Sequence, residues 1–124
     1  MQETTYSRWL ISDMYYPSES IEGPIKSHEA ICVLNTNDQD AGLTITLYFE
    51  DREPMRLAPQ CCPARRNVHI RMDEAKTADG SGVPMDTPYA AVVESTQPVA
   101  VQYSRADARQ RALGIMTTIA QPIG

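Results

Sequence analysis

The stretch "LTITLYFE", residues 43–50, alternates apolar and polar side chains with a period of two. In an extended chain Leu43, Ile45, Leu47 and Phe49 share one face, while Tyr48 and the two threonines share the other. Such alternation is typical of a β-strand that buries one face and exposes the other to solvent. The stretch therefore predicts a sheet that packs one face onto a hydrophobic core.

Further strand signals lie on both sides of this stretch. "NVHIRM" (67–72) alternates in the same way, with Asn67, His69 and Arg71 on its polar face. Three shorter apolar runs are rich in β-branched residues, which favours more deeply buried strands: "AICVLN" (30–35), "YAAVVES" (89–95) and "VAVQYS" (99–104). We expect "SRWLIS" (7–12) and "GIMTTIA" (114–120) to be the first and last strands.

The connections between these runs carry turn signals. "NTNDQDAG" (35–42), "DREPM" (51–55) and "TADGSGVPMDTP" (77–88) separate strands, and the nine prolines lie in connections. One helix-period segment, "SRADARQRALG" (104–114), predicts a short helix capped by Ser104 and stopped by Gly114. About seven or eight short strands in a single domain over residues 1–124 predict an all-β, immunoglobulin-like antiparallel β-sandwich. Residues 1–5 and 121–124 are expected to be flexible.

Composition narrows the class of protein. A chain of 124 residues fits one domain, and no apolar run approaches the ~20 residues needed to cross a bilayer. The segment "MQETTYSRW" lacks the basic and apolar regions of a signal peptide, and three cysteines agree with a reducing compartment. These features predict a soluble cytoplasmic protein. The net charge of −5 disfavours whole-surface attraction to nucleic acid or anionic lipid.

Residues for catalysis are few. His28 and His69 are far apart in the chain, and no Cys or His cluster has the spacing of zinc ligands. His28 and Glu29 are neighbours on an extended strand, so they face opposite ways and make a poor proton-transfer pair. The sequence therefore predicts no enzyme, no metal and no cofactor. Cys61 or Cys62 acting with His69 as a thiol nucleophile is the catalytic alternative.

Polar residues at strand ends suggest a binding site instead. Asn35, Gln102 and Arg105 end apolar strands, and Arg65 and Arg66 lead into "NVHIRM". In a sandwich, ligand contacts lie at strand ends and on loops, where the rigid sheets hold them. Trp9, the only tryptophan, offers an aromatic face. Each residue also has a structural interpretation: a core tryptophan, a turn-capping asparagine, arginines paired with carboxylates and a histidine on the solvated side of its strand.

Four segments in order resemble the sensory rhodopsin transducer family. They are "SHEAICVLNTNDQDAGLTITLYFEDREP", "PARRNVHIRMDE", "VPMDTPYAAVVESTQPVAVQYSRADARQ" and "TTIA", and the resemblance covers roughly residues 26 to 120, with a weaker match around Trp9. It implies a compact β-sandwich that assembles as a homotetramer. It also implies a cytoplasmic signalling role, either as a small-molecule-binding domain, with sugars as the expected ligands, or as the partner of a membrane photoreceptor.

The resemblance also implies a set of site residues. The set comprises Trp9, His28, Glu29, Asn35, Arg65, Arg66, His69, Gln102, Arg105 and Asp107. The chain has Tyr103 where the family often has histidine, which replaces a group titrating near pH 6.5 with one titrating near pH 10. The segment "DMYYPSESIEGP" (13–24) follows the family pattern only loosely.

Three functions follow from these observations. The leading hypothesis is a non-catalytic domain that binds a small polar ligand and signals, in which Gln102, Asn35 and Glu29 bond a hydroxylated ligand and Arg65 or Arg105 holds an anionic group. The second is a soluble transducer that docks to a membrane photoreceptor. The third is a DNA-binding regulator using the basic strip that runs from Arg65 to Arg71, although the acidic total disfavours it.

Overall fold

The chain folds as two packed layers of antiparallel strands. The structure is a computed structural model that describes residues 5–123, and this part of the chain contains nine strands and no helix. The strands are β1 (Tyr6–Met14), β2 (His28–Asn35), β3 (Ala41–Tyr48), β4 (Met55–Arg56), β5 (Gln60–Cys62), β6 (Arg66–Arg71), β7 (Tyr89–Asp107), β8 (Gly114–Ile119) and β9 (Gln121–Pro122). The predicted all-β antiparallel sandwich is confirmed, with nine strands instead of seven or eight.

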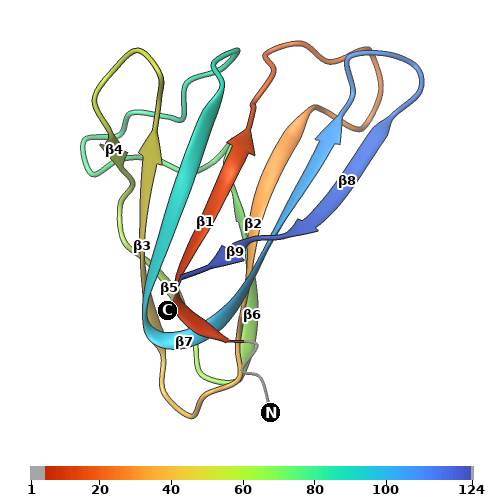
Figure 1. The fold of residues 1–124 in the computed structure, drawn as a ribbon. Helices are drawn as coiled ribbons and strands as arrows, with labels where there is room; N and C mark the ends of the chain where they lie inside the picture. The colour runs from red at the N-terminus through yellow and green to blue at the C-terminus, as the bar shows by residue number, and fades with distance from the viewer. Residues whose placement is uncertain (1–4, 124) are drawn as a thin grey trace.

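One long strand belongs to both layers. The first part of β7 pairs with β3 up to Ser95 and with β1 up to Val99, and its second part, from Ala100, pairs with β2 and β8. β4 and β5 extend the first layer beside β3, β9 pairs with β1, and β6 extends the second layer beside β2. The segments "YAAVVES" and "VAVQYS" are therefore two halves of one bent strand. In Figure 1 the two layers meet near the bend of β7 and splay apart toward the other end.

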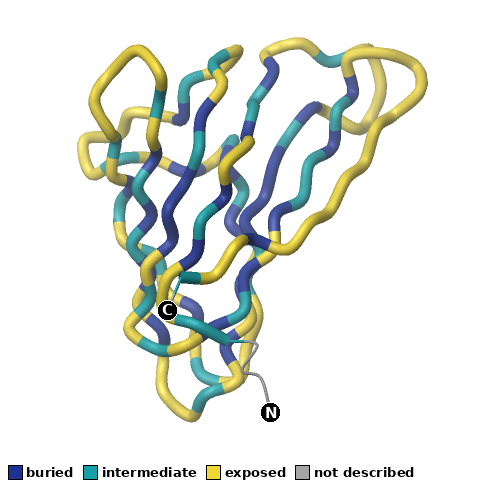
Figure 2. Tube along the Cα trace, in the orientation of Figure 1, coloured by how far each residue is buried: buried dark blue, intermediate teal, exposed yellow. Residues whose placement is uncertain are grey.

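The core lies between the layers and follows the alternation in the sequence. Leu43, Ile45 and Leu47 of β3 are buried against Ile31 and Val33 of β2, and the residues between them are less buried. Figure 2 shows this as buried segments on the inner strands and exposed segments along the loops and β8. The period of two thus fixes which face of each strand enters the core.

The predicted helix at residues 104–114 is wrong. Ser104 and Asp107 lie at the end of β7, where residues 102–107 pair with β8 on one side and residues 100–106 pair with β2 on the other. Residues 108–113 form the connecting loop. Strand pairing on both sides satisfies the backbone of this segment, and it outweighs the weak local preference for a helix.

The structure describes only part of the two chain ends that were predicted to be flexible. Residues 1–4 and 124, which were expected to be flexible, lie outside the described residues. Gln121 and Pro122 of the predicted flexible tail form β9, in which Pro122 is opposite Trp9 and Gln121 is opposite Leu10. Beyond β9, the backbone N–H of Ile123 donates to the carbonyl of Arg8 at 2.9 Å. The strand predicted as the last, at residues 114–120, is therefore followed by one more.

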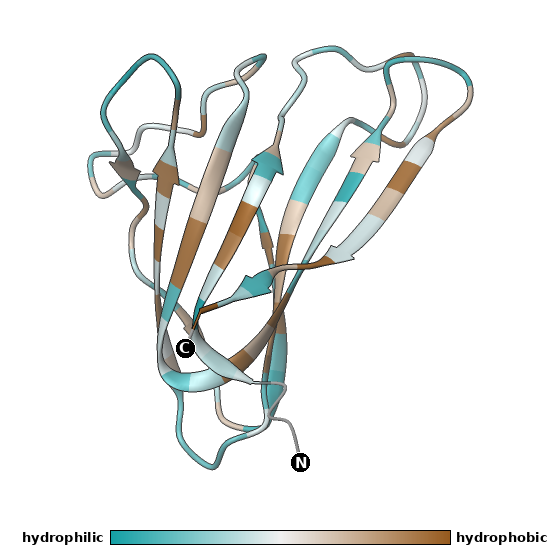
Figure 3. Cartoon of the chain, viewed as in Figure 1, coloured by the Kyte–Doolittle hydropathy of each residue, from teal (hydrophilic) through white to brown (hydrophobic). Residues whose placement is uncertain are grey.

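Apolar colour in Figure 3 runs along the inner strands, as expected for a buried core, but it also appears on β8 at the edge of the second layer. Ile115, Met116 and Ile119 of β8 are 72%, 45% and 69% exposed. The apolar character of "GIMTTIA" therefore does not reflect burial within this chain.

Candidate functional site

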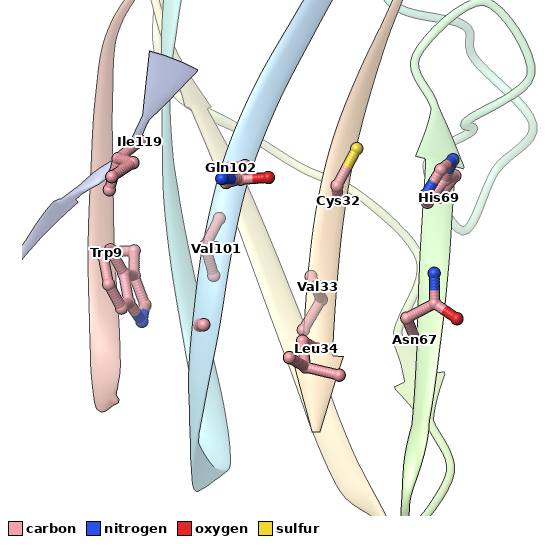
Figure 4. A pocket seen from close by; sticks show the side chains of 10 residues that line it. Trp9, Cys32, Val33, Leu34, Asn67, His69, Val101, Gln102 and Ile119 are labelled. Carbon is pink, nitrogen blue, oxygen red and sulfur yellow. The ribbon is translucent and has the colours of Figure 1, made fainter. Parts of the chain in front are cut away.

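A groove crosses the outer face of the second layer. The strand register places His69, Cys32, Gln102 and Ile119 directly opposite one another, in one row across β6, β2, β7 and β8. These residues alternate with core residues such as Ile31 and Val101, so their side chains point away from the core. Figure 4 shows the side chains of the row lying along the groove.

A second row of residues and a tryptophan complete the groove. Asn67, Leu34 and Ala100 lie opposite one another one step along the strands, and they line the same depression. Trp9 lies at the end near Ile119 and Val101 (Figure 4). The groove has a volume of about 470 Å³, which is within the range of small-molecule pockets.

Trp9 helps to shape the groove, but its side chain exposes little surface that a ligand could contact. The side chain is only 3% exposed, and its indole Nε1–H donates to the carbonyls of Val99 at 3.0 Å and Tyr6 at 3.1 Å. The ring of Tyr6 packs edge-on against it, with 5.8 Å between ring centroids. Because both partners of the indole N–H are backbone groups, the position of the ring is fixed before any ligand arrives.

Among residues 5–123, no carboxylate, lysine or arginine lines the groove. Its polar groups are the amides of Gln102 and Asn67, the imidazole of His69 and the thiol of Cys32. Amides and imidazole can both donate and accept hydrogen bonds, which matches the donor and acceptor character of hydroxyl groups. The groove therefore combines a few neutral hydrogen-bonding groups with apolar side chains such as Leu34 and Ile119.

Glu29, another predicted site residue, is fully buried at the open end of the sandwich. Its Oε1 accepts a hydrogen bond from the Tyr89 hydroxyl at 2.7 Å, and its Oε2 accepts one from the Tyr15 backbone N–H at 2.7 Å. The Tyr103 hydroxyl also donates to Oε2, and the guanidinium of Arg105 lies 3.8 Å from the same oxygen. The carboxylate thus joins β2 to both halves of β7 and to the chain after β1.

The surroundings of the cluster favour the protonated form of both tyrosines. Burial raises the pKa of Tyr89 far above its usual value, and the negative charge of Glu29 raises it further. Burial likewise raises the pKa of Tyr103, and the hydrogen bond to Glu29 adds to the effect. Arg105 donates from Nε to the Tyr103 hydroxyl at 2.9 Å, so this oxygen accepts one bond and donates another. Glu29 therefore has a structural role as a hydrogen-bond acceptor, and it does not line the groove.

Asn35 closes the opposite end of the inner face of β2. The side chain is 0% exposed, and its Nδ2 donates to the carbonyls of Gln39 at 2.9 Å, Cys62 at 3.1 Å and Pro63 at 3.3 Å. Its Oδ1 accepts from the backbone N–H of Asn37 at 3.0 Å and from the Asn37 side chain at 2.8 Å. Every polar atom of Asn35 is engaged in fixing the turn that follows β2.

The remaining charged residues of the predicted set pair locally. Arg65 donates from Nε to Asp38 at 2.7 Å, and Arg66 donates to the carbonyl of Arg65 at 3.0 Å. Asp107 accepts from Nη2 of Arg109 at 2.6 Å, and these hydrogen bonds lower the pKa of Asp107. None of these residues lines the groove.

His28 and Arg105 line a smaller depression near the start of β8, together with Ile25, Ser104 and Ile115. His28 bonds through Nδ1 to the carbonyl of Lys26 at 2.8 Å. The predicted opposite orientation of His28 and Glu29 agrees with their burial, since His28 is half-buried and Glu29 is inside the core. The structure therefore brings Trp9, His69 and Gln102 together, and it separates them from the other predicted site residues.

The cysteines are free thiols. Cys62 is buried, burial raises its pKa, and its Sγ lies 3.3 Å from the carbonyl of Arg66 and 3.8 Å from that of Val33. Within residues 5–123 there is no group of three or more His, Cys, Asp or Glu placed to hold a metal ion. The same part of the chain contains no helix long and apolar enough to span a membrane.

Sequence reasoning did not select Cys32 and Asn67 for the site. Asn67 lies on the same polar face of "NVHIRM" as His69, so the period of two was the available signal. Cys32 lies in the apolar run "AICVLN", which predicted a deeply buried strand, but it is half-buried and lies opposite both His69 and Gln102. Its place in the row depends on the register of three strands, which no local pattern encodes.

Comparison with known families identifies the chain. A sequence model described as Anabaena sensory rhodopsin transducer matches residues 4–122. The chain belongs to this family. The resemblance inferred from the sequence is therefore confirmed, and the match extends further toward the N-terminus than the segments that suggested it.

Solved structures of similar proteins agree with the family. The structure described as "Crystal Structure of Thermotoga maritima 1070" has a TM-score of 0.83 and 31% identity, covering 98% of this chain and 97% of that one. The structure described as "Anabaena sensory rhodopsin transducer" has a TM-score of 0.72 and 37% identity, covering 84% of this chain and 90% of that one. A comparison with curated proteins gives no match.

Proposed function

We propose that this member of the sensory rhodopsin transducer family is a non-catalytic domain that binds a small hydroxylated metabolite, such as a sugar, and passes the signal on through protein contacts. The observation that carries the proposal is the groove, in which Gln102, Asn67 and His69 face a depression of about 470 Å³. A rigid sheet holds these groups in place, so binding would cost little ordering of the protein.

The lining favours a neutral ligand over an acidic one. The arginines that were expected to hold an anionic group do not line the groove: Arg105 contacts Tyr103 and Glu29, and Arg65 pairs with Asp38. An anion placed there would lose its hydration without gaining a cation in return. We therefore expect neutral sugars to bind more tightly than the corresponding sugar acids.

Thermal unfolding against a panel of compounds tests the proposal. The panel contains neutral monosaccharides, including glucose and galactose, and galacturonate as an acidic comparison. A ligand present at one hundred times its Kd stabilises the native state by about 2.7 kcal/mol, which raises the melting temperature by several degrees for a domain of this size. We expect such a shift with at least one neutral sugar and a smaller shift with galacturonate.

Two variants test whether the ligand-induced shift in melting temperature arises from binding in the groove. Gln102→Ala removes an exposed side chain from the centre of the row, and we expect the ligand-induced shift to disappear. Gln110→Ala is the matched control, because Gln110 is an exposed glutamine in the loop before β8 and does not line the groove. A shift that survives in Gln102→Ala, or the absence of any shift across the panel, contradicts the proposal.

Contact with a membrane photoreceptor is a second candidate function. Its support is the family itself and the 37% identity to the structure described as Anabaena sensory rhodopsin transducer. Binding of the purified chain to a microbial rhodopsin from the same genome, held in a lipid nanodisc, is the direct measurement. Saturable binding that is absent with empty nanodiscs supports this function, and equal signals from both argue against it.

The compartment and the assembly belong to the same proposal. We propose that the chain acts in the cytoplasm as a homotetramer, as the resemblance to the family implies.

A DNA-binding role has less support, because Arg65 and Arg71 of the basic strip pair with Asp38 and Asp73 at 2.5 Å and 2.8 Å. Pairing with carboxylates reduces the positive charge that phosphates would otherwise meet.

A further inference from the structure

The two ends of the groove differ in chemistry. At the β6 end, Asn67 and His69 line the groove, and both side chains are polar and exposed. At the β8 end, the lining side chains are the buried Trp9 and Ile119, which is 69% exposed. Figure 4 shows these two pairs at opposite ends of the groove, with β2 and β7 between them. A ligand that fills the groove therefore meets hydrogen-bonding groups at one end and apolar groups at the other.

Apolar side chains also line part of the middle of the groove. Leu34 of β2, which is 47% exposed, lies opposite Ala100 of β7. Ile119 lies opposite Gln102, two residues along β7 from Ala100, so it is diagonal to Ala100 on the same face. Ala100 has only a methyl side chain, which leaves room between its larger neighbours. We call Leu34, Ala100 and Ile119 the apolar patch of the groove.

The length of the groove indicates a ligand with two parts. β6, β2, β7 and β8 are neighbouring strands. Three spacings of about 4.8 Å separate β6 from β8, so the groove extends about 14 Å across the strands. A single sugar ring is shorter than this and cannot contact both Asn67 and Ile119. Two joined groups, each about the size of a ring, can contact both ends.

The lining indicates the chemistry of each part. A second sugar ring at the β8 end would place hydroxyl groups against Leu34 and Ile119, whose side chains cannot form hydrogen bonds. A wholly apolar ligand would cover Asn67 and His69 and remove their hydration without replacing it. No charged side chain among residues 5–123 lines the groove, so neither part of the ligand gains from carrying a charge. The favoured ligand is neutral, with a hydroxylated part and an apolar part.

We propose that the groove binds a neutral glycoside with an apolar aglycone, such as an aryl glycoside. The sugar ring hydrogen-bonds to Asn67 and His69 at the β6 end, and the aglycone packs on the apolar patch near β8. The amide of Gln102, between the two ends, can donate to the oxygen that joins the two parts. The inference rests on the proposed binding function of the groove and names the class of ligand.

Isothermal titration calorimetry with matched glycosides tests the proposal. Methyl β-glucoside and phenyl β-glucoside share a sugar ring and differ only in the aglycone, and the two corresponding galactosides form a second pair. Burial of about 55 Å² of apolar surface corresponds to a tenfold gain in affinity. For at least one sugar, we expect the phenyl glycoside to bind with a Kd at least tenfold lower than that of the methyl glycoside.

Variants separate the two parts of the site. Leu34→Asn removes an apolar side chain from the patch, and we expect the tenfold preference for the phenyl glycoside to be lost while the Kd of the methyl glycoside is unchanged. Leu113→Asn is the matched control, because Leu113 is 37% exposed and does not line the groove, and it should keep the preference. Asn67→Ala should raise the Kd of both glycosides by a similar factor of roughly three to ten.

The outcomes distinguish failure of this inference from failure of the proposed function. Equal Kd values for the phenyl and methyl glycosides overturn the inference, while their binding in the groove still supports the proposed function. Absence of binding by every glycoside and every free sugar contradicts both. A preference for the phenyl glycoside that persists in Leu34→Asn overturns the inference, and so does binding of phenol alone that is as tight as binding of phenyl β-glucoside.

Discussion

Glu29 and Asn35 show how the strand period decides the role of a polar residue. Both lie on the inner face of β2, in step with Ile31 and Val33, and both are 0% exposed. A buried polar group is stable only when its hydrogen bonds are satisfied, and the neighbours of each residue provide these bonds. The alternation that places both residues on the inner face was visible in the sequence. The partners of Glu29, and two of the carbonyls that Asn35 contacts, come from distant segments that no local pattern identifies.

Glu29→Ala is expected to destabilise the protein by about 3–5 kcal/mol, because it leaves the Arg105 guanidinium and two tyrosine hydroxyls without their buried acceptor. Urea unfolding measures the change. Glu50→Ala is the matched control, since Glu50 is exposed, and its effect should stay within about 0.5 kcal/mol. A loss below about 1 kcal/mol for Glu29→Ala contradicts the role given to the cluster.

Tyr103 predicts a dependence of stability on alkaline pH. Burial and the hydrogen bond to Glu29 raise the pKa of Tyr103 in the folded protein, so the folded state holds its proton more tightly than the unfolded state. This contribution is complete below the ordinary tyrosine pKa of about 10 and is lost as the pH rises above it, by up to about 1.4 kcal/mol per pH unit.

Tyr103→Phe removes this titrating group, and the free energy of unfolding should then fall less steeply above about pH 10. The measurement is the urea midpoint at a series of alkaline pH values. Tyr48→Phe serves as the control, because Tyr48 is 44% exposed, and it should keep the wild-type slope. Equal slopes for Tyr103→Phe and the wild type would refute the assignment.

At the scale of elements, the sequence predicted strands better than their connections. Alternation located β3 and β6, and short apolar runs located β2 and both halves of β7. The continuity of β7 was not visible, because Gln97 and Pro98 have the composition of a turn, yet the strand bends there without ending. The false helix at residues 104–114 has the same cause, since the pairing of β7 with β2 and β8 is long-range.

A core residue and an edge residue should respond differently to the same truncation. Ile31→Ala removes a side chain that is 0% exposed between the layers, and we expect a loss of about 2–5 kcal/mol. Ile119→Ala, 69% exposed on β8, should change the stability of the isolated chain by less than about 0.5 kcal/mol. Urea unfolding of Ile31→Ala and Ile119→Ala at low protein concentration provides the comparison, and similar losses would contradict the assigned core.

At the scale of the whole molecule, the groove is a product of topology. His69, Cys32, Gln102 and Ile119 are contributed by four strands, β6, β2, β7 and β8, and they meet because the register aligns them. The sequence indicated polar residues at strand ends, but it could not say which of them share a face. Only Trp9, His69 and Gln102 of the ten predicted residues line the groove.

Binding of a neutral hydroxylated ligand in this groove can be mapped directly by NMR. Amide spectra of the ¹⁵N-labelled protein are recorded while glucose, galactose and other neutral monosaccharides are added one at a time. We expect saturable shifts for residues of the row, above all Cys32, His69 and Gln102, with Arg65 and Asp107 unchanged. Spectra that do not respond to any of these sugars, or shifts confined to residues outside the groove, would contradict binding in the groove.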